Sequence, residues 1–518
     1  MVFFTDKNGT PFDVENPEEF LSSKALLRRS KQGISIQVND LPVNPAYISQ
    51  IEALGVATYY QTKWMNGVLV QMDESQLAQV EALSFVLNTE FVAPNAPLTV
   101  LPSTMAEGPS DPENDLAFPQ TSILGIDDMH DDGFRGEGVI IGIFDDGFQN
   151  LSIIPYFEHL LNNNKIAYTF DYVRGRETVS NNFHHGLRSL STIAAVGDDY
   201  LGTAPDATFI LAATEDPPTE YRIEEYNWLF AAEQADSAGV DIISTSLGYS
   251  DAFSDPSMDY ATSDMDGETA VITVASNLAA SKGIALVSSA GNQGNSLWSI
   301  ITAPADSEQV LAVGATNVAG EQASFSSEGP NAKGVIKPDV VAVGRFTSLV
   351  NVAGNTTFQS GTSFSAPQVA GLAAGLWQAF PNLTNSELLQ LIRESGNTAD
   401  NPDNRFGFGF PNWNRAIELI NTSNQDSKPS FSVFPNPLSG DFISLSVNED
   451  NSGNEDNSGN LIDIQLINDR GQSVESLSKR VFGSLPSLRI SLAELPPGLY
   501  IIRLFNSEGS ASRKIIKY

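Results

Sequence analysis

Two apolar segments constrain the fold of this chain more than any other feature. Residues 139–144 and 284–290 are nearly continuous runs of aliphatic and small side chains. A run without polar alternation is typical of a strand buried on both faces, as in a parallel sheet covered by helices on each side. The sequence therefore predicts an α/β fold for the part of the chain that contains these segments.

Polar residues follow both predicted strands. Asp145 comes directly after the first, and Asn292 follows the second within a glycine-containing turn. Because α/β sheets place their chemistry at the carboxyl ends of strands, these two side chains are candidate site residues. A side-chain amide in such a position could donate a hydrogen bond to a developing oxyanion.

Ser363 stands between a Gly-Thr turn and a strongly apolar helical pattern over residues 364–377. Backbone N–H groups at the amino end of a helix lack intrahelical partners, and the helix dipole is positive there. Both effects favour negative charge that develops beside a serine. We therefore interpret Ser363 as a nucleophile whose own N–H, together with Asn292, forms an oxyanion hole.

A serine hydroxyl needs a histidine base and a carboxylate that orients the base. The chain has 4 histidines. His185 begins a predicted helix over residues 185–195, whereas His130 lies in a polar segment and His159 in a loop-like or helical one. His185 is the preferred base, with Asp145 as its carboxylate.

Each of these motifs alone also has an ordinary structural explanation. An aspartate pair before glycine often only ends a strand, and a serine at a helix start often only caps it. Short motifs match by chance frequently. The order Asp145, His185, Asn292 and Ser363, each at a predicted strand end or helix start, favours the catalytic interpretation.

In this order the chain resembles the subtilases, the subtilisin-like serine peptidases. Residues 202–207, 325–330 and 337–340 also resemble segments of that family, so the resemblance runs from 122 to roughly 421. It implies a mostly parallel sheet flanked by helices and an acyl-enzyme mechanism that requires no cofactor. It also implies that Ser246, Leu247 and Gly248 line the substrate, pairing with its backbone as an added strand.

Four positions differ from the residues usual in the motifs of the family: Asp146, Leu187, Phe364 and Ser365. The last three remove no proton-transfer or oxyanion group. Asp146 places a second carboxylate beside Asp145, and like-charge repulsion could raise the pKa of Asp145. We expect the lower limb of the pH–rate profile to be shifted toward alkaline pH.

Residues 1–96 alternate predicted helices, including 17–30, with predicted strands, which indicates a small α+β domain. Its pattern and position resemble a subtilase propeptide, which assists folding and blocks the cleft until it is cleaved; a constitutive accessory domain is the alternative. A linker rich in proline and acidic residues follows at 97–119, where we expect autocleavage. The peptidase domain is predicted over 120–422.

A polar linker over 423–430 precedes predicted strands that form a β-sandwich over 431–518. The six-residue repeat at 448–453 and 454–459 is predicted to be a disordered hairpin loop. The start and the end of this domain resemble the sorting tail of Bacteroidetes proteins exported by the type IX secretion system. An immunoglobulin-like binding or stabilising module is the alternative.

The formal net charge is −35, which argues against binding to nucleic acid or anionic membranes. Acidic residues in 251–266 offer hard oxygen ligands for structural calcium, but a solvated acidic surface is the simpler explanation, so no metal ligand is assigned. The chain has 0 cysteines, which excludes disulfides and thiol catalysis. No segment resembles a membrane span or a leader peptide, and the leader of an exported protein is expected to be absent from this sequence.

These features predict a secreted or cell-surface serine endopeptidase made as a zymogen. Its expected partners are protein or peptide substrates, its own propeptide and an export machinery. A catalytically silent scaffold that acts as an adhesin is the alternative, and a G-x-S-x-G esterase is a poorer third because Ser365 occupies the second glycine position. The expected walls of the primary pocket, 246–249 and 288–291, carry no charge, which suggests a broad or apolar cleavage preference.

Overall fold

A computed structural model describes residues 1–94 and 118–426, and beyond these 431–434, 442–447, 461–468, 474, 479–482, 488–493, 495–505 and 510–518. The chain forms two compact units, Met1–Ala416 and Ile417–Tyr518. The predicted linker at 97–119, except its last two residues, and the predicted loop at 448–459 lie outside the described residues. Residues 423–426, expected in a linker, instead end helix α12 (Trp413–Asp426), since no glycine or proline interrupts 412–428.

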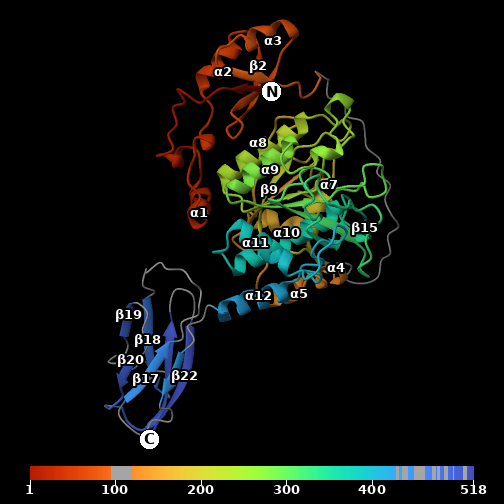
Figure 1. The fold of residues 1–518 in the computed structure, drawn as a ribbon. Helices are drawn as coiled ribbons and strands as arrows, with labels where there is room; N and C mark the ends of the chain where they lie inside the picture. The colour runs from red at the N-terminus through yellow and green to blue at the C-terminus, as the bar shows by residue number, and fades with distance from the viewer. Residues whose placement is uncertain are drawn as a thin grey trace. The chain divides into compact units, whose positions relative to one another are not determined.

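A seven-stranded sheet forms the centre of the first unit, and every pairing in it is parallel (Figure 1). The strand order is β13-β12-β11-β10-β5-β9-β6. The strands are β5 (Ile140–Asp145), β6 (Ile166–Asp171), β9 (Thr208–Ala213), β10 (Ile242–Thr245), β11 (Ala285–Ser289), β12 (Val310–Thr316) and β13 (Val340–Val343). Strands β10 to β13 are buried along their whole length, as expected for strands covered on both faces.

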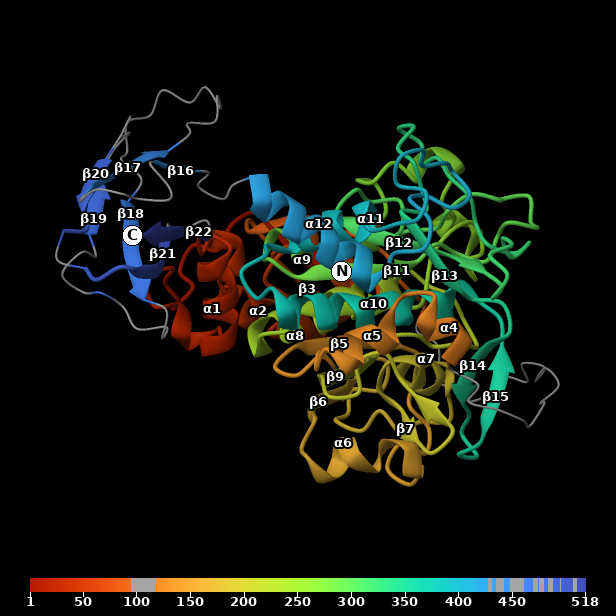
Figure 2. The same cartoon turned by 90° about the horizontal axis from the view of Figure 1, so that it is seen from below.

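Helices cover both faces of this sheet. Figure 1 shows α8 and α9 on one side and α10 and α11 on the other, and Figure 2 shows α10 on the face seen from below. The α-helices described between residues 118 and 394 are α4 (Phe118–Ser122), α5 (Ile126–Asp131), α6 (Glu158–Asn162), α7 (His185–Ala194), α8 (Ile223–Ala238), α9 (Val271–Ser281), α10 (Thr362–Ala379) and α11 (Asn385–Glu394). Short strand pairs are β7 (Val196–Gly197) with β8 (Tyr200–Leu201) and β14 (Thr347–Val350) with β15 (Thr356–Gln359).

Small residues allow α10 to run through the crowded core. Residues 362–377 of this helix are all buried. A Cβ on Gly371 would lie 1.8 Å from Thr203 Oγ1, and one on Gly375 would lie 2.1 Å from Met129 Sδ. Neighbouring segments therefore approach the helix backbone directly, and this packing fixes the position of its amino end.

The N-terminal part of the first unit has its own antiparallel sheet, in the order β2-β3-β1-β4, packed on two helices. The elements are β1 (Val2–Phe4), α1 (Ser23–Lys31), α2 (Pro45–Glu52), β2 (Ala57–Thr62), β3 (Gly67–Gln71), α3 (Glu74–Glu81) and β4 (Val86–Thr89). The single helix predicted over 17–30 is wrong: a short 3-10 turn at Pro17–Glu19 is followed by α1. Ser22 starts α1 as a new helix, because its side chain accepts a hydrogen bond from the N–H of Ala25.

The second unit contains two antiparallel sheets, β16-β17-β20 and β19-β18-β21-β22. The strands are β16 (Phe431–Phe434), β17 (Phe442–Val447), β18 (Leu461–Asn468), β19 (Lys479–Phe482), β20 (Leu488–Ser491), β21 (Gly498–Phe505) and β22 (Ser510–Lys517). Side chains of both sheets share one core, including Ile443, Leu466 and Ile502. This arrangement agrees with the expected β-sandwich. Among the described helices of the chain, none combines the length and apolarity needed to cross a membrane.

Candidate active site

The predicted carboxylate and base lie in direct contact. Strand β5 ends at Asp145 and helix α7 begins at His185, whose Nδ1 lies 2.7 Å from Asp145 Oδ1. The same Oδ1 accepts the backbone N–H of Asp146 at 2.8 Å, and Oδ2 accepts the buried hydroxyl of Ser189 at 3.1 Å. Asp145 is thus held by three donors, which fixes its orientation toward the imidazole.

Asp146 turns back toward the start of α7. Its Oδ1 accepts the N–H of Gly186 at 3.0 Å, and its carbonyl oxygen accepts Asn181 Nδ2 at 2.8 Å. Burial and the neighbouring charge of Asp145 raise the pKa of Asp146 to about 7. The structure thus places a raised pKa on Asp146, the carboxyl that distinguishes this site from the usual family sequence.

The imidazole of His185 has an unusually high proton affinity. Burial alone would lower its pKa, but the charge of Asp145, the hydrogen bond to it and the charge of Asp146 together raise the pKa of His185 to about 9. A histidine base acts in its neutral form. Its electrostatic surroundings therefore favour activity on the alkaline side of neutrality.

The rings of His130 and His159 contact backbone carbonyl groups instead of catalytic side chains. His130 Nε2 lies 3.0 Å from Thr203 O, and His159 Nε2 lies 3.2 Å from Pro205 O. Burial is the first cause that lowers the pKa of each. These contacts agree with the choice of His185 over the other two as the base.

Ser363 is the second residue of α10 and lies beside the end of β10. Its hydroxyl donates to Ser246 O at 3.1 Å, while Ser246 Oγ donates to Ser363 O at 2.9 Å. The ring of Phe364 lies 5.3 Å from that of His185, centroid to centroid. The helix start and the imidazole are therefore neighbours, and hydroxyl–imidazole hydrogen bonds often tighten only when substrate binds.

Asn292 is anchored to the same helix start. Its Oδ1 accepts both the backbone N–H and the Oγ1–H of Thr362, each at 2.9 Å. Because the oxygen end of the amide is held in this way, the Nδ2 group faces away from Thr362. The N–H of Ser363, the next residue along, occupies a helix position that has no intrahelical acceptor, and Asn292 contacts the same start of α10.

The segment 246–248 continues from β10 and is fastened to the neighbouring strand. Ser289 Oγ donates to Leu247 O at 3.2 Å, and Gly248 is exposed. The three residues predicted to line the substrate therefore form an edge beside Ser363. Sequence reasoning missed Ser189, although its spacing of four residues after His185 places both on one face of α7.

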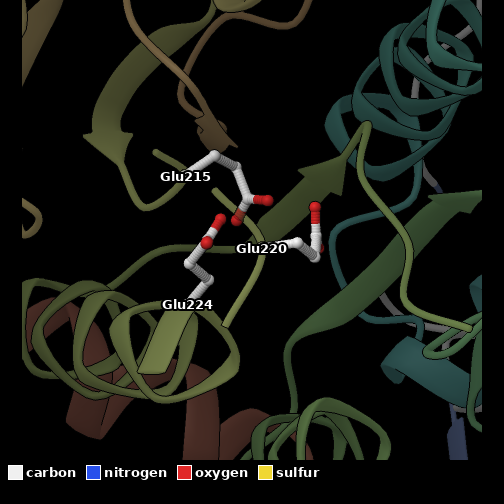
Figure 3. Close-up of side chains that lie close together, drawn as sticks. All are labelled: Glu215, Glu220 and Glu224. Atoms are coloured by element: carbon white, nitrogen blue, oxygen red, sulfur yellow. The ribbon is translucent and has the colours of Figure 1, made fainter. Parts of the chain in front are cut away.

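Three acidic side chains lie close to one another: Glu215 after β9, Glu220, and Glu224 at the start of α8 (Figure 3). One ligand atom from each lies within 4.8 Å of the others. Burial, and for Glu215 and Glu224 the neighbouring carboxylates, raise their pKa values, to about 8 for Glu215 and about 7 for Glu220. Such oxygens could hold a hard cation.

The acidic residues in 251–266, offered by the sequence as possible calcium ligands, make local hydrogen bonds where the structure describes their contacts. Asp255 and Asp266 accept backbone N–H groups of the residues that follow them, and Asp264 accepts the N–H of Ala261. These carboxylates cap local turns.

A protein-family model for the subtilase family matches residues 136–409, more than half of the chain. The chain belongs to the subtilase family. The residues matched include Asp145, His185, Asn292 and Ser363.

Curated subtilases are similar to the same part of the chain. Subtilisin E of Bacillus subtilis is 29% identical over 295 residues, which cover 54% of this chain and 65% of that protein. The subtilisin-like protease SBT6.1 of Arabidopsis thaliana is 28% identical over 279 residues, 52% of this chain and 24% of that protein. In both cases the chain spans less than two thirds of the relative's length.

Family models also match both ends of this subtilase. Residues 1–106 match a peptidase S8 propeptide domain of Bacteroidota, and residues 432–518 match a secretion system C-terminal sorting domain. Among solved structures, that of the MycP3 protease from a type VII secretion system covers 60% of this chain and 91% of its own, with 20% identity and a TM-score of 0.47. MycP1 with its propeptide removed gives a TM-score of 0.45 at 21% identity.

Proposed function

We propose that this subtilase is a secreted serine endopeptidase made as a zymogen, with Asp145, His185 and Ser363 as its catalytic triad. The observation that carries the proposal is the 2.7 Å contact between His185 Nδ1 and Asp145 Oδ1 beside the helix start that bears Ser363. With Nδ1–H bound to the carboxylate, the tautomer of neutral His185 has a basic Nε2.

The reaction follows from these roles. His185 takes the proton of Ser363 as the hydroxyl oxygen attacks a peptide carbonyl, and Asp145 stabilises the imidazolium that forms. His185 then gives the proton to the departing amine, and water hydrolyses the acyl-enzyme by the same proton transfers in reverse. Asn292 Nδ2 and the N–H of Ser363 hold the oxyanion.

Substrate is proposed to pair its backbone with Ser246, Leu247 and Gly248 as an added strand. Hydrogen bonds between two backbones place every bound peptide in the same register, whatever its sequence. This arrangement suits an enzyme that cleaves within proteins, because the scissile carbonyl is brought to Ser363 by backbone contacts alone.

The N-terminal domain, residues 1–94, is proposed to act as inhibitor and folding aid of the peptidase domain. Its Arg28 and Arg29 form ion pairs with Asp236 on α8, and all three side chains are buried. Arg28 Nε also donates to Lys282 O at 3.2 Å, and Gln32 Nε2 to Gly283 O at 2.8 Å. These donors satisfy carbonyls just beyond the end of α9, where helix ends need partners.

A second group of contacts joins the same domain to α8. Glu233 accepts the backbone N–H groups of Lys63 and Trp64 at 2.8 and 3.0 Å and the hydroxyl of Thr62. Buried charges paired across an interface are costly to separate. Proteolysis of the domain after cleavage of the linker, rather than simple dissociation, is the expected route to the mature enzyme.

The C-terminal domain is proposed to direct passage through the type IX secretion system. The support is the match of residues 432–518 to a secretion sorting domain. Secretion or display at the cell surface follows from this function, and the export machinery is the partner of this domain. Whether the domain is removed afterwards is open to a direct test by mass measurement of the secreted protein.

A fluorophosphonate probe tests the catalytic proposal against the silent-scaffold alternative. An active triad would make Ser363 react covalently once the N-terminal domain is cleaved, and Ser363→Ala would abolish labelling. Ser191→Ala, on the same helix as His185, serves as a control that keeps all three catalytic side chains, because Ser191 Oγ contacts only backbone groups. Failure of the processed wild-type protein to label would refute the endopeptidase proposal.

A further inference from the structure

A pocket of about 240 Å³ lies in the segment between β6 and α7. Two arginines, a serine, two asparagines and one aromatic ring line it: Arg174, Arg176, Ser180, Asn181, Asn182 and Phe183. All five polar side chains carry N–H or O–H donors. Within the part of the chain that the structure describes, no carboxylate belongs to this lining, although the chain has 63 acidic and 28 basic residues. A lining of this composition suits an anionic ligand.

The wall formed by residues 180–183 is anchored beside the catalytic base. Asn181 Nδ2 donates to Asp146 O at 2.8 Å, and Asn181 Oδ1 accepts the N–H of Phe183 at 2.9 Å. Phe183 precedes His185 by two residues, a separation that spans at most about 7 Å of chain. The pocket therefore has a fixed position next to the site of the proposed reaction.

The two arginines stand on a tight turn that follows β6. Asp171 and Arg176 exchange backbone hydrogen bonds of 2.7 and 3.2 Å. Gly175, between the arginines, has a φ of +63°, a conformation that favours glycine. The guanidinium of Arg174 lies 5.2 Å from the centre of the Phe183 ring. These contacts hold both guanidinium groups at the pocket.

The charge of Arg176 is the less balanced of the two. Both arginines contact the same oxygen of Asp171, whose side chain is fully buried, each at 3.4 Å. Arg174 has a second carboxylate, because its Nη2 lies 3.1 Å from Asp216 Oδ1. The side chain of Arg176 is 43% exposed and reaches Asp171 through Nε. Its two terminal Nη groups can therefore bind the carboxylate of a ligand.

Building on the proposed peptidase function, we propose that this pocket binds the side-chain carboxylate of an aspartate or glutamate in the substrate, with Arg176 as the main donor. A peptide bound between His185 and Ser363 passes the wall 180–183, so one of its side chains can enter the pocket at a fixed distance from the scissile bond. A guanidinium distinguishes a carboxylate from the corresponding amide, because the amide has one acceptor oxygen and carries no charge. The uncharged walls expected for the primary pocket do not supply this selectivity.

Neutral peptides with a single cleavage site and blocked ends test the assignment. An aspartate or glutamate is moved one position at a time along both sides of the scissile bond, with asparagine or glutamine as its isosteric control. The processed enzyme is expected to show one position at which the acid raises kcat/KM roughly 3- to 10-fold over the amide. Because the contact is partly exposed, about 0.5 M sodium chloride should reduce this ratio.

Variants of Arg176 assign the preference to the pocket. Arg176→Gln should bring the acid-to-amide ratio close to about 1 and leave kcat/KM for the all-neutral peptide unchanged. Arg176→Lys keeps the charge but loses the paired donors, so its ratio should lie between those of the wild type and Arg176→Gln. Lys333→Gln is the matched control: Lys333 is 42% exposed, pairs with Glu268 and lies outside the pocket, so its removal should leave the ratio at the wild-type value.

Labelling of Ser363 by a fluorophosphonate separates the two proposals. If the wild-type enzyme neither labels nor cleaves any peptide, the endopeptidase proposal fails. Normal labelling and cleavage without an acidic preference at any position would refute the role of the pocket alone. A preference that persists in labelled Arg176→Gln, or that falls equally in Lys333→Gln, would also overturn it. If Arg176→Gln does not fold, the wild-type and Arg176→Lys ratios decide.

Discussion

The hydroxyl of Ser189 donates to Oδ2 of Asp145 at 3.1 Å, on the oxygen that His185 does not contact. Ser189 follows His185 by one helical turn, so a single helix supplies both the base and a donor that fixes the carboxylate of the base. The carboxylate is therefore oriented by α7 as well as by its own strand.

Ser189→Ala is expected to lower kcat by roughly 10-fold with little change in KM, because a hydrogen bond to a charged group contributes about 1.5–3 kcal/mol. Steady-state kinetics on a peptide substrate measures the effect. Ser191→Ala is the matched control, since Ser191 Oγ donates to Arg188 O and accepts the N–H of Val350 but does not contact Asp145. Equal kcat values in the two variants would contradict a positioning role for Ser189.

Asp146→Asn is expected to shift the lower limb of the kcat/KM profile toward acid by roughly one pH unit. The charge of Asp146 stabilises the imidazolium and so raises the pKa of His185, whose neutral form is the active base. Removal of that charge lowers this pKa and makes the base available at lower pH. The asparagine oxygen can still accept the N–H of Gly186. A lower limb that stays in place in both Asp146→Asn and Asp146→Ser would disprove the coupling.

Asn292→Ala is expected to reduce kcat by roughly 100- to 1000-fold, the cost of losing one oxyanion-hole donor in a subtilisin. Asn292→Asp keeps the oxygen that accepts both Thr362 donors but replaces the Nδ2 donor with a negatively charged oxygen. The kcat of Asn292→Asp should be no higher than that of Asn292→Ala. An active Asn292→Asp enzyme would show that Asn292 acts mainly as an anchor of α10.

Asp236→Ala, made in a Ser363→Ala background to prevent processing, is expected to lower the free energy of unfolding by about 3–5 kcal/mol. The substitution leaves the buried guanidinium groups of Arg28 and Arg29 without their shared carboxylate. Urea unfolding measures the change. Lys24→Ala is the control: it removes the more exposed 2.7 Å pair with Asp241 and should cost about 1 kcal/mol or less.

Wild-type protein is expected to cleave its own chain within the predicted linker at 97–119, whereas the Ser363→Ala variant should remain a single chain. Mass spectrometry of the purified proteins over time gives both the cleavage position and its dependence on Ser363. Persistence of full-length wild-type protein under conditions where Ser363 labels would argue that the N-terminal domain is a constitutive part of the enzyme.

Sequence patterns alone determined the buried strands, the order Asp145, His185, Asn292 and Ser363, and the three-part organisation that the family models matched. This information is local: apolar runs specify buried strands, and polar residues at their carboxyl ends specify where a site can form. The helix over 17–30 was wrong in detail because the cap at Ser22, a single hydroxyl, starts α1 anew.

Only the tertiary structure decided which groups surround those residues. Three examples are the contact of Ser189 with Asp145, the effect of Asp146 on the pKa of His185, and the ion pairs of Asp236 with Arg28 and Arg29. Each joins segments from different elements. Such contacts depend on the packing of α7 to α10 against the sheet. They also depend on burial, because charges and hydrogen-bonding groups interact more strongly where water is excluded. A sequence pattern identifies the reacting groups, but the distances between those groups and their burial are set only when the chain folds.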